Sequence, residues 1–185
     1  MMETTLATPQ EIQKRVWMEL GRATQDRHHA WRTPVLATIR ADAMPDARTI
    51  VLREVDASAF NLRFYTDSRS QKVADLAAQP RAMLVFWSKR LSWQLRLQVS
   101  FTIHTEGQVV DSVWDRVNQS ASAADYLSAR APGTPLSTPT PERLQDRHHL
   151  AILSAVVQEA DWLELARGGH RRARFSSETW EWLVP

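Results

Sequence analysis

Two arginines at the ends of a short β-branched stretch are the first residues in this sequence that can do chemistry. Arg48 and Arg53 bound RTIVLR, a composition typical of a β-strand. Their guanidinium groups suit planar, bidentate recognition of phosphate or carboxylate. Because side chains alternate along a strand, both can reach one ligand only if a bulge or a strong twist intervenes. The alternative is two exposed arginines that flank a core strand.

A second cationic site lies in FYTDSRSQK, where a predicted strand gives way to a helix. A helix N-terminus presents unpaired backbone N–H groups and the positive end of the helix dipole. The positive charge of Lys72 is unfavourable beside the positive end of that dipole. A bound anion would reverse this effect, because the N–H groups, the Ser70 hydroxyl and Lys72 would hold it together. The alternative is an ordinary Ser70 N-cap with a solvated lysine.

Two further polar groups lie on predicted strands later in the chain. Gln94, in LSWQLRLQ, can hydrogen-bond the edge of a heterocycle, or it can be a surface glutamine. In HRRARF, alternation places His170, Arg172 and Arg174 on one face, where three cationic groups repel each other unless an anion lies between them. Without acidic residues nearby on that face, the pattern favours an anion site over a basic edge strand that blocks aggregation.

Several other chemistries are disfavoured by the sequence. Cysteine is absent, which excludes disulfides, thiolate catalysis and zinc–thiolate sites. No His/Asp/Glu spacing matches a metal site, and neither a nucleophile elbow nor Gly-x-Gly-x-x-Gly occurs. The formal net charge is +2, and the arginines are dispersed rather than gathered in the basic stripe of a nucleic-acid binder. We therefore expect a small-molecule ligand, with no metal and no nucleic-acid partner.

The elements that must position these residues form an α+β pattern built on an antiparallel β-barrel with flanking helices. Strands are predicted over 33–40, 48–55, 61–66, 81–88, 91–110, 154–166, 170–177 and 179–185. Helices are predicted over 8–21, 68–79, 111–119, 122–130 and 141–151. We expect one domain over 1–185, with a helical extension over 1–30 and a surface loop over 132–141. The absence of a long apolar run or a signal-peptide pattern is compatible with a cytoplasmic protein.

Taken in order, several of these segments resemble the pyridoxamine 5'-phosphate oxidase family. They are TPVLATIR, PDARTIVLR, FYTDSRSQK, QPRAMLVFW, WQLRLQ, HRRARF and WEWLVP. The resemblance runs roughly from Pro34 to Pro185 and rests on order and spacing. It implies the FMN-binding split barrel, a Greek-key antiparallel barrel, with FMN bound at the interface of a homodimer.

By position, the resemblance implies a set of FMN contacts spread along the chain. Arg48 lies where the family holds the phosphate and ribityl chain, and Ser70-Gln71-Lys72 matches a Ser-Arg-Lys phosphate motif with glutamine in place of arginine. Arg130 and Arg174 would complete the site of the neighbouring subunit. The implied set is Arg48, Thr49, Ile50, Val51, Leu52, Arg53, Tyr65, Thr66, Ser70, Gln71, Lys72, Gln94, Arg130 and Arg174.

The residues implied in catalysis depart more from the family pattern. Arg53 would stabilise the reduced flavin, while His170 and Arg172 occupy the family's Arg-x-His substrate grip with the residue types exchanged. The trio that holds the vitamin phosphate is not recognisable in 113–122, and the flavin-stacking tryptophan is not clearly placed, although Trp162 is close. The resemblance thus implies an FMN-dependent oxidoreductase acting on pyridoxamine or pyridoxine 5'-phosphate. An FMN-dependent reductase of another substrate and a non-catalytic flavin-binding protein remain alternatives.

Overall fold

The structure is a computed structural model that describes residues 8–137 and 143–185. The predicted N-terminal extension and the predicted surface loop therefore lie partly outside the described residues. In the described ranges, no helix is long and apolar enough to cross a membrane.

Helix α1, Pro9–Gln25, begins at Thr8 with a capping box. The Glu11 backbone N–H donates to Thr8 Oγ1 at 3.3 Å, and the Thr8 N–H donates to Glu11 Oε2 at 3.0 Å. The helix does not end at Gly21 as predicted. Its apolar stripe continues to the buried Ala23, and Arg32 Nη1 donates to the carbonyls of residues 23 and 24 at 3.2 and 3.0 Å. This donor satisfies the end of the helix, so a single internal glycine is tolerated.

The other helices are short: η1 Ala30–Arg32, α2 Gln71–Ala78, α3 Gln108–Val117 and η2 Ala121–Tyr126. Residues 108–110, predicted as strand, belong to α3, because Gly107 turns the chain with a φ of 89°.

Two predicted helices around the surface loop are wrong. Of 122–130, only the short 3-10 helix η2 forms, and residues 143–149 contain no helix. These stretches bond each other instead: the Ala129 N–H donates to the Arg143 carbonyl and the Gln145 N–H to the Leu127 carbonyl, both at 2.8 Å. Because these backbone groups pair with each other, they are not available for helical hydrogen bonds.

The strands confirm the predicted α+β antiparallel architecture. They are β1 Val35–Ile39, β2 Pro45–Thr49, β3 Leu52–Asp56, β4 Asn61–Asp67, β5 Arg81–Ser88, β6 Trp93–His104, β7 Leu150–Glu164, β8 Arg171–Phe175 and β9 Trp180–Leu183. All pair antiparallel in the order β2-β1-β5-β6-β7-β4-β3, and β8 pairs with β7 and β9. The predicted strand 48–55 is in fact two strands, β2 and β3, separated at residues 50–51.

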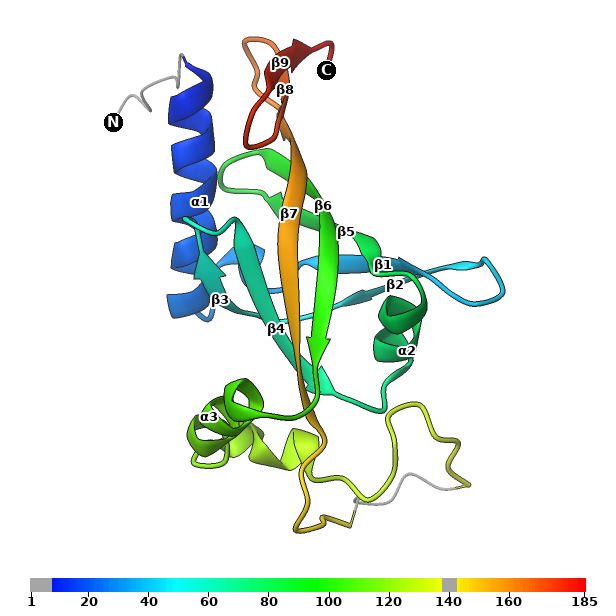
Figure 1. Cartoon of the computed structure of the whole chain (residues 1–185). Coiled ribbons are helices and arrows are strands. Elements are labelled where there is room, and N and C mark those ends of the chain that lie inside the picture. The colour runs from blue at the N-terminus through cyan, green and yellow to red at the C-terminus, as the bar shows by residue number, and fades with distance from the viewer. Residues whose placement is uncertain (1–7, 138–142) are drawn as a thin grey trace.

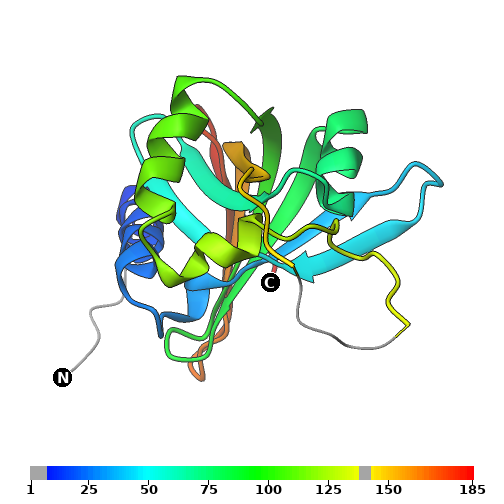
Figure 2. The ribbon, with the colours of Figure 1, turned by 90° about the horizontal axis from the view of Figure 1, so that it is seen from below.

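Strand β7 organises the sheet. It pairs with β6 along its length, with β4 through residues 150–156 and with β8 through residues 160–164. Buried apolar side chains such as Leu36, Phe64 and Leu95 fill the interior. Helices α1 and α2 lie on opposite sides of the sheet, and α3 lies across one end (Figures 1 and 2). β8 and β9 are therefore at the opposite end of the molecule from α3 (Figure 1).

A buried carboxylate ties α1 to the barrel. Glu19 is fully buried, and Arg15, Arg22 and Arg90 approach it at 2.8, 3.0 and 2.8 Å. His29 Nε2 lies 3.0 Å from its second oxygen. Burial alone would raise the pKa of Glu19, but the hydrogen bond from His29 and the three arginines outweigh it, so the pKa is lowered. Glu19 is therefore ionised and joins α1 to the β5–β6 turn.

Glu19→Gln is expected to lower the free energy of unfolding by about 2–3 kcal/mol, since hydrogen bonds to a charged group contribute about that much. Urea unfolding followed by circular dichroism measures this. Arg22→Gln is the control: its side chain is 53% exposed, so its loss should cost no more than about 1 kcal/mol. Equal losses in the two variants would show that the buried carboxylate has no special role.

Candidate functional site

Arg48 on β2 lies against helix α2. Its Nη1 donates to Thr38 Oγ1 at 2.7 Å, and its Nη2 pairs with Asp46 and lies 3.5 Å from Asp75 Oδ2. Asp75 is buried and also accepts from Thr38 Oγ1 at 3.0 Å and from Gln71 Nε2 at 2.9 Å. The Arg48 side chain is only 19% exposed, so the alternative of a surface arginine is wrong at this position.

Lys72 is the second cation at the start of α2. Its Nζ donates to Thr66 Oγ1 at 3.1 Å, and Thr66 Oγ1 lies 3.4 Å from Ser70 Oγ. Ser70 is buried and does not cap the helix with its side chain; it donates to the Asp67 carbonyl at 2.8 Å. The alternative of an ordinary serine cap with a solvated lysine is therefore wrong.

We call Arg48, Thr66, Ser70, Gln71 and Lys72 the α2 cluster. Burial lowers the pKa of Lys72 from its usual value, and nearby Arg48 lowers it further. Both effects disfavour the charged form of Lys72 in the absence of a bound anion. The first turn of α2 adds backbone N–H groups and the helix dipole. The donor set fits a phosphate group.

A strand break and a bulge separate Arg48 from Arg53, which is the condition under which both can reach one ligand. Residues 50–51 lie outside the strands, and the β3–β4 register shifts between Leu52 and Glu54. The Arg53 guanidinium carbon lies 5.8 Å from the centre of the Tyr65 ring. Its Nε is buried and has no hydrogen-bond partner among the described residues. Arg53 is thus not a surface arginine, and one of its donors is available.

The stretch between the two arginines alternates buried and accessible side chains. Ile50 and Leu52 are buried in the core, Val51 is half-buried and Thr49 is exposed. A ligand along this stretch can therefore meet the side chains of Thr49 and Val51, whereas the Ile50 N–H already donates to the Pro34 carbonyl at 3.0 Å.

Sequence reasoning missed the polar group around Tyr65. The Tyr65 hydroxyl donates to Glu54 Oε1 at 2.5 Å, and Arg63 and Arg116 donate to the same carboxylate at 3.0 and 2.8 Å. Burial and the bond to Glu54 raise the pKa of Tyr65, which keeps its phenol protonated. The Glu54–Arg63 pairing across the β3–β4 hairpin was detectable in principle, but Arg116 arrives from α3 through tertiary packing.

The Glu54 carboxylate makes the free energy of unfolding depend on pH. Burial would raise the pKa of Glu54, but hydrogen bonds from Tyr65, Arg63 and Arg116 outweigh it and lower the pKa below 4.5. The stabilising contribution is therefore present above pH 4.5 and is lost as the pH falls through the lowered pKa. Urea unfolding at neutral and acidic pH should show a smaller loss of stability for Glu54→Gln than for the wild type. An identical loss would contradict this assignment.

The arginines of β8 lie among carboxylates, so the prediction that their face lacks acidic residues is wrong. Arg172 binds both oxygens of the buried Asp161, at 3.0 and 2.7 Å, which raises the pKa of the arginine. Arg174 lies 3.6 Å from Glu159 and 3.4 Å from Glu181. Nor is β8 an edge strand, because β9 pairs with it. The acids come from β7 and β9, whose pairing with β8 the local sequence does not reveal.

The outer face of the sheet brings Gln94 near the β8 residues. Gln94 on β6 is opposite Leu163 on β7, which is opposite Arg172 on β8. The family resemblance implies a tryptophan near this point that stacks on the flavin. Trp162 is fully buried in the core, and the neighbouring residue that faces outward is Leu163. His170 is exposed and precedes β8.

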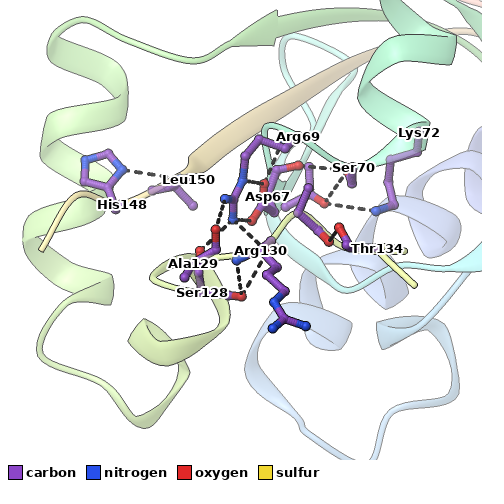
Figure 3. Close-up of polar contacts among 12 residues, drawn as sticks. Asp67, Arg69, Ser70, Lys72, Ser128, Ala129, Arg130, Thr134, His148 and Leu150 are labelled. Carbon is purple, nitrogen blue, oxygen red and sulfur yellow. Dashed lines mark hydrogen bonds and ion pairs between the residues drawn. The ribbon is translucent and has the colours of Figure 1, made fainter. Parts of the chain in front are cut away.

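Arg130 lies in the segment that follows η2. Its backbone is held close to the start of α2, and its guanidinium extends away from Arg69 (Figure 3). The β8 arginines lie at the other end of the molecule from this segment (Figure 1). Within a single chain, the residues of the α2 cluster lie together, whereas Arg172 and Arg174 lie far from that cluster.

Comparison with known proteins identifies the family of the chain. The profile of the pyridoxamine 5'-phosphate oxidase FMN-binding domain matches residues 14–105. A pyridoxine/pyridoxamine 5'-phosphate oxidase from Acaryochloris marina is 31% identical over 189 residues, covering 98% of this chain and 78% of that protein. The chain belongs to the pyridoxamine 5'-phosphate oxidase family. A relative from Thermosynechococcus vestitus is 48% identical over 63 residues, but the match covers 34% of this chain and 29% of that protein.

Solved structures of this family's fold extend over nearly the whole chain. A pyridoxamine 5'-phosphate oxidase-related, FMN-binding protein from Nostoc punctiforme has a TM-score of 0.72 at 22% identity, covering 98% of this chain and 100% of that one. PhzG from Burkholderia lata, solved with tetrahydrophenazine-1-carboxylic acid, has a TM-score of 0.70 at 18% identity and covers 98% and 95%. A heme-binding protein from Mycobacterium smegmatis has a TM-score of 0.55 at 15% identity, covering 88% and 58%. These likenesses establish the split-barrel fold, which serves proteins of differing ligands.

Proposed function

We propose that this chain binds FMN, with the flavin phosphate at the α2 cluster. The observation that carries the proposal is that two cations, Lys72 and Arg48, lie near each other at the first turn of α2. Lys72 is half-buried, bonds the neutral Thr66, and has no ion pair with a carboxylate among the described residues. A dianionic phosphate would place negative charge beside Lys72 and accept from the first backbone N–H groups of α2.

We further propose an oxidoreductase role. Bound FMN would supply hydride-transfer chemistry, which no side chain of this sequence offers. Arg53 is the residue that we assign to the flavin ring. Its buried Nε–H has no hydrogen-bond partner among the described residues, and a fixed cation there would stabilise negative charge on a neighbouring group. The Tyr65 ring, whose hydroxyl donates to Glu54, lies against the Arg53 guanidinium as a cation–π partner.

The proposed substrate is a pyridoxine- or pyridoxamine-type phosphate, the class named in the relatives of this chain. A non-catalytic flavin-binding role is the second candidate, and a specific observation favours it. Arg172 is engaged by Asp161 and Arg116 by Glu54, so substrate anions would have to compete with internal carboxylates. An FMN-dependent reductase of another substrate would face less competition if that substrate lacked a phosphate.

A homodimer is part of the proposal, because Arg174 can reach an α2 cluster only if it is that of a second copy. Large apolar side chains are exposed close to the β1–β2 and β5 strands: Val35, Ile39, Met44 and Trp87 are 36%, 46%, 59% and 47% exposed. Such side chains are typical of a surface that another protein covers. Light scattering at micromolar concentration is expected to give twice the chain mass, and a monomer would argue against the shared site.

Steady-state assays separate the candidate activities. FMN-loaded protein is supplied with oxygen and either pyridoxine 5'-phosphate or pyridoxamine 5'-phosphate, and peroxide is measured. Turnover with release of peroxide supports the oxidase. Bleaching of the flavin by NADH or NADPH without vitamer oxidation supports the reductase. Tight FMN binding with neither response supports the non-catalytic alternative and overturns the oxidoreductase proposal.

A further inference from the structure

Arg69, in the turn between β4 and α2, joins two segments that are far apart in the sequence (Figure 3). Its backbone N–H and Nε donate to Asp67 Oδ1 at 2.8 and 3.0 Å, and its Nη2 donates to Asp67 Oδ2 at 2.7 Å. The same guanidinium donates to the carbonyls of Ser128, Ala129 and Arg130 at 2.9, 3.5 and 3.2 Å. We call this set of bonds the Arg69 clasp.

The clasp leaves Arg69 no role as a direct phosphate ligand. Its Nε and both of its terminal nitrogens already donate to oxygens of the protein. Position 71, where the resembling motif has arginine, is Gln71, and its amide is bonded to Asp75. Arg69 therefore does not take over the role of the family arginine that position 71 lacks. The positive charge near an anion at α2 comes from Arg48 and Lys72.

The clasp instead shapes the turn from which α2 begins. The Asp67 carbonyl accepts from the Ser70 N–H at 3.1 Å and from the Ser70 hydroxyl at 2.8 Å. The Asp67 side chain is only 4% exposed, so without Arg69 a buried carboxylate would lose its ion-pair partner. An unpaired carboxylate at this depth would rearrange toward solvent, and the turn that holds Ser70 would move with it.

The second half of the clasp secures the segment 128–130 beside this turn. Within that segment, Ser128 Oγ donates to the Arg130 carbonyl at 2.9 Å, and the Arg130 N–H donates to Ser128 Oγ at 3.2 Å. The Ser68 N–H also donates to the His149 carbonyl at 2.7 Å. The segment is thus preformed, and Arg69 attaches it to the start of α2.

We propose that Arg69 is a positioning residue for the flavin phosphate, acting through Asp67 and the 128–130 segment without touching the ligand. The inference rests on the proposed binding of FMN. In this inference Arg69 fixes the position of the first backbone N–H groups of α2, and the positive charge beside the phosphate comes from Arg48 and Lys72.

The test compares FMN with riboflavin, which has the same ring system and no phosphate. Arg69→Met is expected to bind FMN about 10-fold more weakly while riboflavin affinity stays within about twofold, since only the phosphate contacts are disturbed. The slope of FMN affinity against salt concentration should stay unchanged, because no ionic contact to the phosphate is lost. Trypsin should cleave faster after Arg130 in this variant, since its segment is released.

Two further variants keep the test decisive. Arg22→Met makes the same change of charge at an arginine of α1 that pairs with Glu19 at 3.0 Å, and it should leave both affinities and the cleavage rate unchanged. Arg69→Lys keeps the charge but cannot reach all the oxygens of the clasp, so an intermediate loss of FMN affinity is expected if Arg69→Met fails to fold.

The outcomes separate this inference from the proposed function. If the wild type binds no FMN, the proposed function fails and the inference falls with it. If the wild type binds FMN and Arg69→Met binds it equally well, the inference alone is overturned. A shallower salt dependence in Arg69→Met would make Arg69 a direct ligand and would also overturn it.

Discussion

Lys72→Met is expected to weaken FMN binding by about 100-fold, or about 2.8 kcal/mol. Lys72 is a half-buried cation that bonds only Thr66 among the described residues, and Arg48 lies close enough to disfavour its charge. A phosphate relieves that repulsion, so the lost interaction is a charge-assisted hydrogen bond in a partly dry site. Titration followed by quenching of flavin fluorescence measures the dissociation constants of the two proteins.

The folding of the variant supplies an independent check. Because the folded state lowers the pKa of Lys72, folding disfavours its charged form, and removing the charge should not destabilise the apoprotein. Lys72→Met should therefore unfold at the same urea concentration as the wild type or a higher one. Lys14→Met, which removes an exposed lysine of α1, is the control and should keep wild-type affinity. Equal FMN affinity in Lys72→Met and the wild type would remove the phosphate from the α2 cluster.

The second large effect is expected when two impaired variants are mixed. In the proposed homodimer, each site takes Lys72 from one subunit and Arg174 from the other. Lys72→Met and Arg174→Met homodimers should each bind FMN poorly. After exchange of subunits, half of the dimers are mixed and one of the two sites in each is intact, so about a quarter of all sites should recover wild-type affinity.

The mixing experiment distinguishes a shared site from two separate defects. If Lys72 and Arg174 served the same chain's ligand, every chain would carry one defect and mixing would restore nothing. The control mixes Lys72→Met with Arg48→Met, both in the α2 cluster of one chain, and no recovery is expected there. Recovery in the control, or its absence in the test mixture, would contradict the shared site.

Local patterns predicted most of the scaffold and failed where distant segments meet. The capping box at Thr8 and the alternation of β6 concern neighbouring residues, and both correspond to what forms. The helix predicted over 141–151 failed because residues 143–145 bond a segment that lies earlier in the chain. Its composition carries no sign of that partner.

The candidate site likewise contains residues that the sequence singled out and contacts that depend on distant segments. Arg48 and Lys72 lie 24 residues apart, and their assignment to one phosphate, which the family resemblance implies, stays a prediction. The pairing of Arg172 with Asp161 depends on the β7–β8 register, so the prediction of a face without acids was wrong. The Arg69 clasp joins residues about 60 positions apart, and no local pattern indicates it.

The most direct test of FMN binding is a visible spectrum recorded after the protein has been mixed with FMN and desalted. Binding at the α2 cluster predicts a retained flavin band corresponding to about one FMN per chain, with the same ratio in the dimer because each copy contributes one cluster. A colourless protein that also shows no affinity for FMN in titration would contradict the account. The α2 cluster would then be a cationic network of the split barrel that holds no flavin.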